Sequence, residues 1–267
     1  MEKLISIDLE ADFGFLRKPD TNEGISMTYN MLHKPALLGI FGAILGLKGY
    51  QRLGELPEYY KELHSLKIGV EPLRAENGNF SKTTVVYTNT IGYANKDKNN
   101  APFTFVAYEN TLIKPSYRIF IALSNNHPLY DSLKNGHAEF IPYLGKNEFP
   151  VWWQRESFKE YELKPFDYRG EYQVRTMFCK GDGERSRSYI ADADTDGFSL
   201  LSDLSVMNES FFYFERLPVG FQEFDTKRGK EYQYLLSSFV FSNAKFSESY
   251  KLENLYSIGD NEVVQLN

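Results

Sequence analysis

The segment from Thr28 to Tyr50 constrains the fold most, because it combines a proline, an apolar run and regularly spaced small residues. Pro35 suits the first turn of a helix, where its missing N–H has no partner to lose. Glycine inside a helix costs roughly 0.8–1 kcal/mol relative to alanine, so a face of small residues is expected to meet a neighbour at close range. The apolar run from Pro35 to Leu47 is shorter than the about 20 residues that span a bilayer, which predicts a buried core helix. The small residues recur at spacings of three and four on one helical face: Ala36, Gly39, Ala43 and Gly46.

Composition limits the classes of function. The 267 residues are 42% hydrophobic and 25% charged, which is typical of a globular protein with one large domain or two ordinary ones. The 19 tyrosines and 21 phenylalanines favour strands and can stack on bases, but a net charge of −6 excludes a general attraction to nucleic acid. The single cysteine, Cys179, leaves no internal disulfide. Because the N-terminal residues lack the apolar region of a signal peptide, we expect a cytoplasmic protein with no membrane partner.

Hydrophobic periodicity predicts alternating strands and helices in the first 150 residues. From Ile5 to Phe15 apolar residues alternate with polar ones, which indicates a strand with one face in solvent. A second helix is expected to start at Pro57, and Gly136 is expected to close a helix over Pro128–Asn135. The other expected elements are strands over Lys67–Leu73, Thr83–Thr90, Phe103–Leu112, Lys114–Leu123 and Ala138–Leu144.

This order predicts an α+β fold with a ferredoxin-like, or RRM-like, domain over residues 1–150. A hairpin of about residues 83–112, with a polar tip at Gly92–Pro102, is expected to protrude from its middle strands as a thumb. Residues 151–267 are expected to form a β-rich part, with a turn at Lys227–Gly229 and the domain boundary near Pro150. The strands expected in this part are Trp152–Leu163, Glu171–Cys179, Phe211–Leu217 and Tyr232–Phe241.

Motifs for catalysis or metal binding are weak. The segment Asp192–Asp203 resembles part of a calcium loop, with aspartates at alternate positions before Gly197, but its flanks do not indicate helices. We therefore interpret it as an exposed acidic turn. Cys179 has no nucleophile signature, and no phosphate-binding loop is present. No metal, cofactor or catalytic residue is therefore expected. Four histidines lack metal-ligand spacing: His33, His64, His127 and His137.

An RRM-like sheet with aromatic and basic residues favours binding to single-stranded RNA, because unstacked bases stack on aromatic rings. The N-terminus of the Pro35 helix would also offer free N–H groups to a phosphate. The ordinary alternative is solvated lysines and tyrosines in strands. The candidate RNA contacts are Arg17, Lys18, Tyr29, His33, Lys34, Gly39, Tyr50, Tyr87, Asn89, Tyr93, Asn95, Lys96, Lys98, Lys114, Arg118 and Lys146.

Several motifs in the same order resemble the Cas five family of CRISPR-associated RAMP proteins, most closely its type I-B branch. The resemblance covers most of the first 150 residues, and in the last 115 or so it is limited to the FERLPVG segment, Phe214–Gly220. The motifs are FGFLRKPDTN (Phe13–Asn22), HKPALLGIFGAILGL (His33–Leu47), PEYYKEL (Pro57–Leu63) and YLGKNEF (Tyr143–Phe149).

The resemblance implies a role in the Cascade surveillance complex. Its members cap the five-prime handle of the guide RNA (crRNA) and contact the backbone subunit and the large PAM-reading subunit, close to target DNA. By resemblance, the glycine-bearing helix lies beside the handle, the thumb lies where handle meets spacer, and Arg17 and Lys18 form a basic loop. Many relatives have arginine where this chain has Leu38, so His33 or Lys34 would have to replace it.

One branch of the family, in type I-C, cleaves precursor RNA with a tyrosine, a lysine and a histidine and without metal. Tyr50 falls near the position of that tyrosine, but the adjacent lysine–histidine pair is missing from this chain. The resemblance therefore implies a non-catalytic RNA-binding subunit, with a metal-independent endoribonuclease as the alternative. A β-rich module that binds only proteins is a third interpretation.

Overall fold

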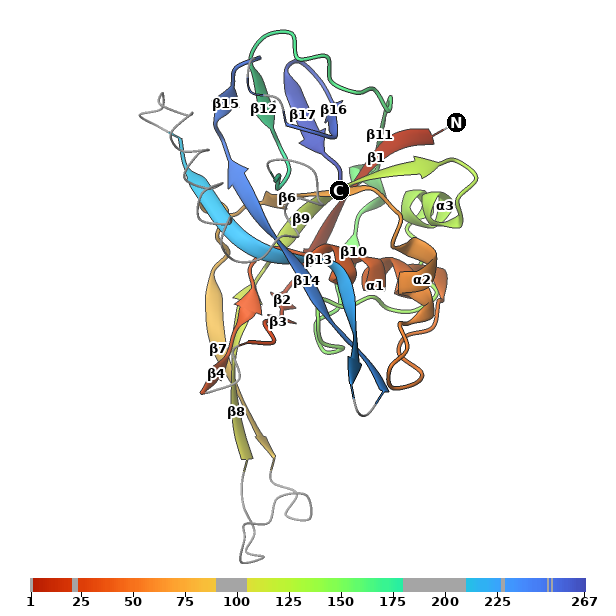
Figure 1. Ribbon diagram of the computed structural model, residues 1–267, viewed down its shortest axis with the longest axis vertical. Coiled ribbons are helices and arrows are strands. Elements are labelled where there is room, and N and C mark those ends of the chain that lie inside the picture. Colours follow the sequence, from red (N-terminus) through yellow and green to blue (C-terminus); the bar gives the residue numbers. More distant parts are fainter. Residues whose placement is uncertain are drawn as a thin grey trace, which may run out of the picture.

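The computed structural model describes residues 2–20, 24–89, 105–179, 210–226, 229–248, 250 and 252–267. It is an α+β fold around an antiparallel sheet with the order β10-β1-β9-β6, in which β11 also pairs with β1 (Figure 1). These strands are β1 (Glu2–Ala11), β6 (Ile68–Leu73), β9 (Ser116–Ser124), β10 (Val151–Trp153) and β11 (Lys159–Tyr161).

Helix α1 (Lys34–Leu45) connects β1 to the β6 edge strand, and α3 (Pro128–Asn135) connects β9 to β10. This order, with the fourth strand beside the first, confirms the ferredoxin-like prediction. The short α2 (Glu58–Leu63) packs against α1, and the helices share one core with the apolar side chains of β1 and β9. No helix among the described residues is long and apolar enough to cross a membrane.

The predicted strand over Ala138–Leu144 is wrong, and β10 supplies the fourth strand instead. The predicted segment lies against the end of α1, where the N–H groups of Glu139 and Phe140 donate to the carbonyls of Ile44 and Ala43 at 3.0 Å. These bonds satisfy carbonyls that a helix end leaves without partners. The segment therefore caps the end of α1 rather than joining the sheet.

Strand β1 does not have the predicted solvent face along its first half. Leu4 and Ser6 are fully buried, because Val264 and Leu266 near the end of the chain pack with Leu4 and Phe120 across that face of the sheet. This cover comes from residues about 260 positions away, so local alternation could not reveal it. The sheet is buried on both faces at this point.

The predicted thumb is a hairpin of β7 (Lys82–Asn89) and β8 (Phe105–Ile113) that projects from the body (Figure 1). Its predicted tip, Gly92–Pro102, lies outside the described residues. The predicted first strand ends at Ala11, because the chain then turns to pair with β8 at the base of the hairpin. The short strands at this base are β2 (Phe13–Gly14), β3 (Leu16–Arg17), β4 (Ile25–Ser26) and β5 (Thr28–Tyr29).

The C-terminal half contributes a small sheet with the order β15-β12-β17-β16 and a second long hairpin. The predicted Trp152–Leu163 strand is interrupted by the 3₁₀ turn η1 (Arg155–Ser157), and Glu171–Cys179 is a strand only over its first part. Because β10 and β11 pair with β1, the central sheet extends past Pro150. The remaining elements are β12 (Tyr172–Val174), β13 (Phe212–Thr226), β14 (Gly229–Ser242), β15 (Lys245–Phe246), β16 (Leu255–Ser257) and β17 (Glu262–Gln265).

Candidate nucleic-acid interface

Residues 138–149, which we call the connector, link two regions of candidate contacts. The connector starts on the end of α1 and reaches the base of the β7–β8 hairpin, where the N–H of Phe15 donates to the carbonyl of Leu144 at 3.0 Å. Gly145 has a φ of +86°, and a Cβ atom there would collide with the carbonyl of Phe15. The YLGKNEF motif therefore needs glycine at this position to bring Lys146 to the hairpin.

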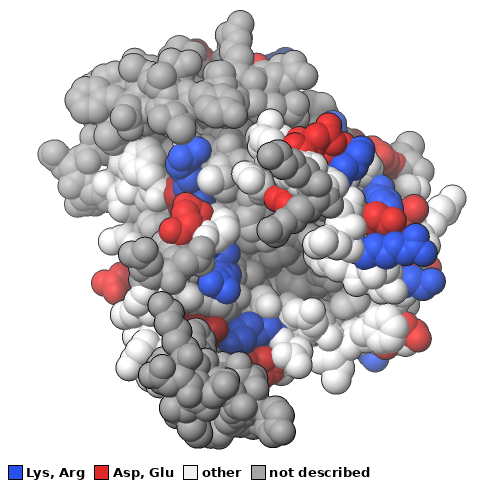
Figure 2. Space-filling view, turned by 60° about the horizontal axis from the view of Figure 1, so that its bottom comes forward, with Lys and Arg blue, Asp and Glu red and all other residues white. Residues whose placement is uncertain are grey.

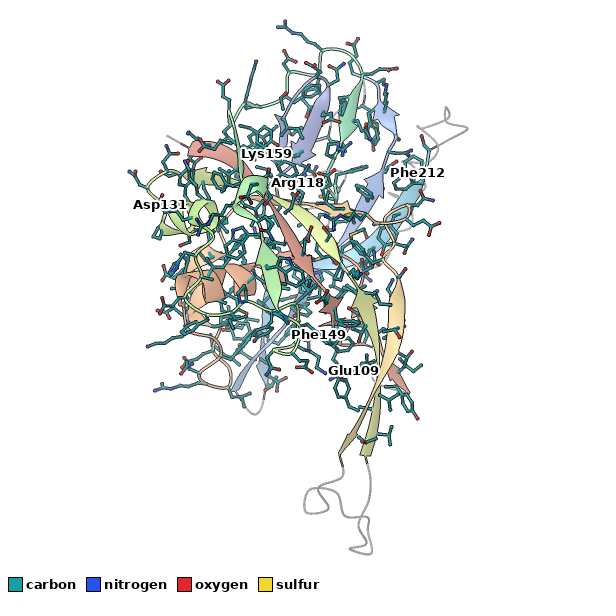
Figure 3. The ribbon with its side chains drawn as sticks, turned by 180° about the vertical axis from the view of Figure 1, so that it is seen from behind. Glu109, Arg118, Asp131, Phe149, Lys159 and Phe212 are labelled. Carbon is teal, nitrogen blue, oxygen red and sulfur yellow. The ribbon has the colours of Figure 1, made fainter. Side chains whose placement is uncertain are left out.

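Lys146 and Tyr87 form an aromatic and basic cluster at the hairpin base. The ammonium lies 3.8 Å from the centroid of the Tyr87 ring and bonds the carboxylates of Glu109 at 2.7 Å and Glu148 at 3.2 Å. Partial burial lowers the pKa of Lys146, but hydrogen bonds to these carboxylates outweigh burial and raise it. Figure 3 places Glu109 on the hairpin, close to Phe149 at the end of the connector. Lys146 is thus already neutralised by the protein's own acids.

One face of the hairpin exposes apolar side chains. Val86 pairs with Tyr108, and Tyr108 also pairs with Ile25 of β4, so the three lie side by side. Their exposed fractions are 52%, 43% and 44%, and Val106 nearby is 38% exposed. A contiguous apolar face of this kind marks an interaction surface in soluble proteins.

The face predicted from the spacing, Ala36, Gly39, Ala43 and Gly46, is only partly buried, and the closest contact with α2 is made by Gly42 instead. A Cβ atom on Gly39 would lie 3.7 Å from the Tyr59 ring, and a Cβ atom on Gly42 would collide with Tyr59. Gly46 takes no part in this contact: it is the left-handed C-cap of α1. Burial raises the pKa of the Tyr59 hydroxyl, and the nearby Tyr50 raises it further. Gly39 is therefore covered by a ring, while Tyr50 is 60% exposed.

The N-terminus of α1 does not offer the free N–H groups that the sequence predicts. The Nδ1 atom of His33 is the N-cap and accepts from the N–H of Ala36 at 3.3 Å. Burial lowers the pKa of His33 to about 3, so the ring is neutral. His33 and Tyr29 are both buried and pack edge to face, which corrects their prediction as surface contacts. Lys34 is partly buried, and burial lowers its pKa to about 8.

The N–H groups just before α1 are also occupied, by a carboxylate from β13. Glu215 accepts from the N–H groups of Asn30 and Met31, each at 3.0 Å, and from the Tyr213 hydroxyl at 3.0 Å. Lys18 lies 3.1 Å from the same carboxylate. Paired charges and backbone N–H groups together satisfy this buried carboxylate. Glu215 thus satisfies N–H groups in the segment that leads into α1.

Other predicted cations are spread over the surface. Arg118 forms two hydrogen bonds to Asp8, at 2.7 and 2.8 Å, which raise its pKa, while Arg17 and Lys114 are exposed. Figure 2 shows basic and acidic side chains interspersed on the face it presents. The predicted residues outside the described part are Tyr93, Asn95, Lys96 and Lys98, the side chain of Asn89, and the acidic segment Asp192–Asp203.

Three residues of this region are absent from the sequence-based candidates: Tyr59, Glu109 and Glu215. Tyr59 and Glu215 lie in the motifs PEYYKEL and FERLPVG, so the motifs that carry the family resemblance could have identified both residues as candidates. Nothing in the sequence around Glu109 indicates its bond to Lys146, because that bond spans 37 positions.

The histidines have structural roles where their bonds are seen. His127 caps α3 by accepting from the N–H of Leu129, as His33 caps α1. His64 bonds the carbonyl of Lys61 at 3.0 Å. Among the described residues, no group of three or more His, Cys, Asp or Glu side chains is arranged to hold a metal ion.

Comparisons with known proteins find likeness in structure only. No family model and no curated protein matches the chain. A chain of a CRISPR RNA-guided surveillance complex is 14% identical, with 90% of each chain covered and a TM-score of 0.49. A chain of the type III-B Cmr-beta complex bound to cognate target RNA and AMPPnP is 14% identical over 90% of this chain and 86% of that one, with a TM-score of 0.39. A CRISPR-associated protein Cas6 is 12% identical over 91% and 87%, with a TM-score of 0.28.

Proposed function

We propose that this chain is a non-catalytic RNA-binding subunit of a CRISPR surveillance complex, from the type I-B branch of the Cas five family. It would cap the five-prime handle of the crRNA. The observation that carries the proposal is the ferredoxin-like sheet order with a long hairpin inserted between its second and third strands. The resembling motifs also meet in space: Phe15 bonds Leu144, and Tyr59 packs on Gly42.

RNA would contact the two ends of the connector. Where the hairpin joins the body, a nucleobase could stack on the Tyr87 ring. A phosphate could displace the carboxylates that bond the Lys146 ammonium. At the other end, Tyr50 and Tyr143 are 60% and 48% exposed. Stacking on aromatic rings does not need a strongly basic surface, which suits a chain with a net charge of −6.

Partner subunits would cover the apolar face of the hairpin. Ile25, Val86, Val106 and Tyr108 would meet a neighbouring protein, for which the Cascade backbone subunit is the candidate. The large PAM-reading subunit, with target DNA nearby, would be the second partner. Covering this face would remove an association hazard that an exposed hairpin otherwise carries.

Fluorescence anisotropy with crRNA tests the proposal. Labelled RNA with the repeat-derived handle is compared with RNA of equal length that lacks it. The proteins are the wild type, Tyr87→Leu, Lys146→Met and, as a control, Lys230→Met on the β13–β14 hairpin. We expect RNA with the handle to bind more tightly than RNA without it, and Tyr87→Leu to weaken binding about tenfold. Lys146→Met should reduce the slope of the logarithm of the binding constant against the logarithm of salt concentration by about the value of one phosphate contact. Equal affinity for both RNAs, unchanged by the variants, would contradict the proposal and favour a protein-binding module.

The endoribonuclease alternative has its own test. Cleavage of cognate repeat RNA in EDTA, lost in Tyr50→Phe, would show catalysis by this chain. We expect no cleavage, because general acid–base catalysis needs titratable groups within hydrogen-bond reach of the reacting oxygens and two histidines are used as helix caps.

A further inference from the structure

A cavity of about 420 Å³ lies between the N-terminal end of α1, α2, β6 and the inner face of the β13–β14 hairpin. Its volume is in the range of pockets that hold small molecules. Protein interiors are otherwise packed as densely as organic crystals, so a void of this size is a distinct feature of the fold. The exposed His64 and the partly buried Lys34 belong to its lining, and the cavity therefore reaches the surface.

A bulge in β13 shapes one wall. The pairing of β13 with β14 shifts between Pro218 and Gly220, and Val219 is left without a paired residue. All three residues line the cavity, and a Cβ on Gly220 would lie 2.8 Å from the Tyr60 hydroxyl oxygen. Bulges re-aim side chains and often accompany functional sites. The end of the FERLPVG segment thus builds a cavity wall rather than a regular strand.

Much of the lining is apolar, and one group of polar side chains, Lys34, Asn267 and Cys179, lies where α1 meets the C-terminal residues, while Tyr60, His64 and Ser237 are on other walls. The ammonium of Lys34 donates to the main-chain oxygen of Asn267 at 3.1 Å. Lysine has three donors, and no second acceptor for Lys34 occurs among the described residues. The amide of Asn267 and the buried thiol of Cys179 lie on the same side of the lining. A ligand with an apolar body and an acceptor group at one end matches this distribution.

We propose that this cavity binds a small amphipathic organic anion, with its apolar body between β6 and the β13–β14 hairpin and its anionic group on Lys34. The site is separate from the RNA contacts proposed on the connector and the β7–β8 hairpin, and it gives Lys34, a candidate RNA contact in the sequence, a different role. Desolvation lowers the pKa of Lys34 to about 8, and an anion beside the ammonium would offset that cost. The thiol of Cys179, whose pKa burial raises to about 11, takes no chemical part.

The test uses the full chain and two fluorescent probes of similar shape. 1-Anilinonaphthalene-8-sulfonate carries an anion, and N-phenyl-1-naphthylamine is neutral. We expect Lys34→Met to weaken the anionic probe about tenfold and to leave the neutral probe unchanged, as the loss of one charged hydrogen bond implies. Lys61→Met on the exposed side of α2 is the matched control and should change neither. Val219→Trp should fill the cavity and weaken both probes, with thermal melts to verify that each variant folds.

Equal binding of the anionic probe to the wild type and to both Lys34→Met and Lys34→Gln would overturn the proposal, as would undiminished binding of both probes to Val219→Trp. Competition then identifies the source of the anion. Displacement by nucleoside monophosphates assigns the site to a nucleotide, and displacement by octanoate assigns it to an acyl chain. If neither nucleoside monophosphates nor octanoate displace the anionic probe at millimolar concentration, the assignment to a biological organic anion is overturned.

Discussion

The two long hairpins differ in strand length, with 8 and 9 residues in β7 and β8 against 15 and 14 in β13 and β14, and they have opposite environments. The β13–β14 hairpin runs across the body, with Leu217 and Phe239 in the main core at 4% and 8% exposure. The β7–β8 hairpin projects into solvent, with Val86 at 52% exposure (Figure 1). Each carries a glutamate that bonds a lysine, Glu215 with Lys18 and Glu109 with Lys146. Only Glu215 also accepts backbone N–H groups from another part of the chain.

This difference shows what distinguishes a structural hairpin from an interaction hairpin. Glu215 satisfies N–H groups before α1, so β13 is tied to the helix that forms the core. Glu109 holds only the connector, so the apolar face of β7–β8 stays available. A strand pattern predicts that a hairpin forms, and the long-range polar contacts decide whether it is buried.

The largest effect is expected at Glu215. Glu215→Ala removes a buried carboxylate and its bonds to two N–H groups and to Lys18, which should lower the free energy of unfolding by about 3–5 kcal/mol. Urea denaturation measures this loss. Glu223→Ala on the same hairpin, where the carboxylate is exposed, should leave the midpoint unchanged. A Glu215→Ala midpoint equal to that of the wild type would show that β13 is not tied down by this contact.

The apolar faces of the two hairpins give the next effect. Leu217→Ala should cost about 3 kcal/mol, because it leaves a cavity in the main core. Val86→Ala should change stability by less than about 0.5 kcal/mol, because that side chain is already half in solvent. The two midpoints, measured in the same urea titration, compare the hairpins directly. Similar losses would contradict the distinction drawn between them.

Local patterns predicted most elements of the fold but not the partners of the sheets. The α3 bounds and its Gly136 cap are confirmed, because capping chemistry and helix periodicity act within a few residues. The strand predicted over Ala138–Leu144 is wrong because its Glu139 and Phe140 N–H groups bond the end of α1, and the local sequence does not show this partner. The burial of Ser6 depends on Val264 and Leu266, and no local pattern carries that information.

Only part of the candidate site could be predicted, because local patterns identify residue types but not the distant residues that contact them. Residue types and motifs pointed to Tyr87, Lys146 and the small face of α1, and the structure brings the first two together. They could not show that Glu109 and Glu148 neutralise Lys146, or that His33 and Glu215 occupy the N–H groups at α1. The bonds of Lys146 to Glu109 and of Glu215 to the segment before α1 join residues that are far apart in the sequence, whereas the bond of Lys146 to Glu148 and the cap made by His33 are local.

Acid should loosen the β13–β14 side of the molecule through His33. The ring packs against Tyr234 of β14, and burial lowers its pKa to about 3 from an ordinary value near 6.5. Between these values the unfolded chain binds a proton that the folded chain does not, so stability falls as the pH falls. The loss should reach about 1.4 kcal/mol per pH unit in that window. His33→Asn keeps an N-cap acceptor and should flatten the difference in urea midpoints between pH 7 and pH 5. An equal slope in both proteins would assign the acid sensitivity to carboxylates instead.

The smallest effect separates the two lysine–glutamate pairs. A double-mutant cycle with Lys146→Gln and Glu109→Gln should give a coupling energy of at most about 1 kcal/mol, because the pair is only partly buried, with side-chain exposures of 24% and 16%, and water can reach each partner. The same cycle with Lys18→Gln and Glu215→Gln should give a larger coupling, because Glu215 is 5% exposed. A weak bond at Lys146 is what an RNA-binding lysine requires, since a phosphate must displace Glu109 to reach the ammonium. If the Lys146 coupling equalled or exceeded that of Lys18, the carboxylates would hold Lys146 too tightly for this exchange, and the hairpin base would be a structural joint.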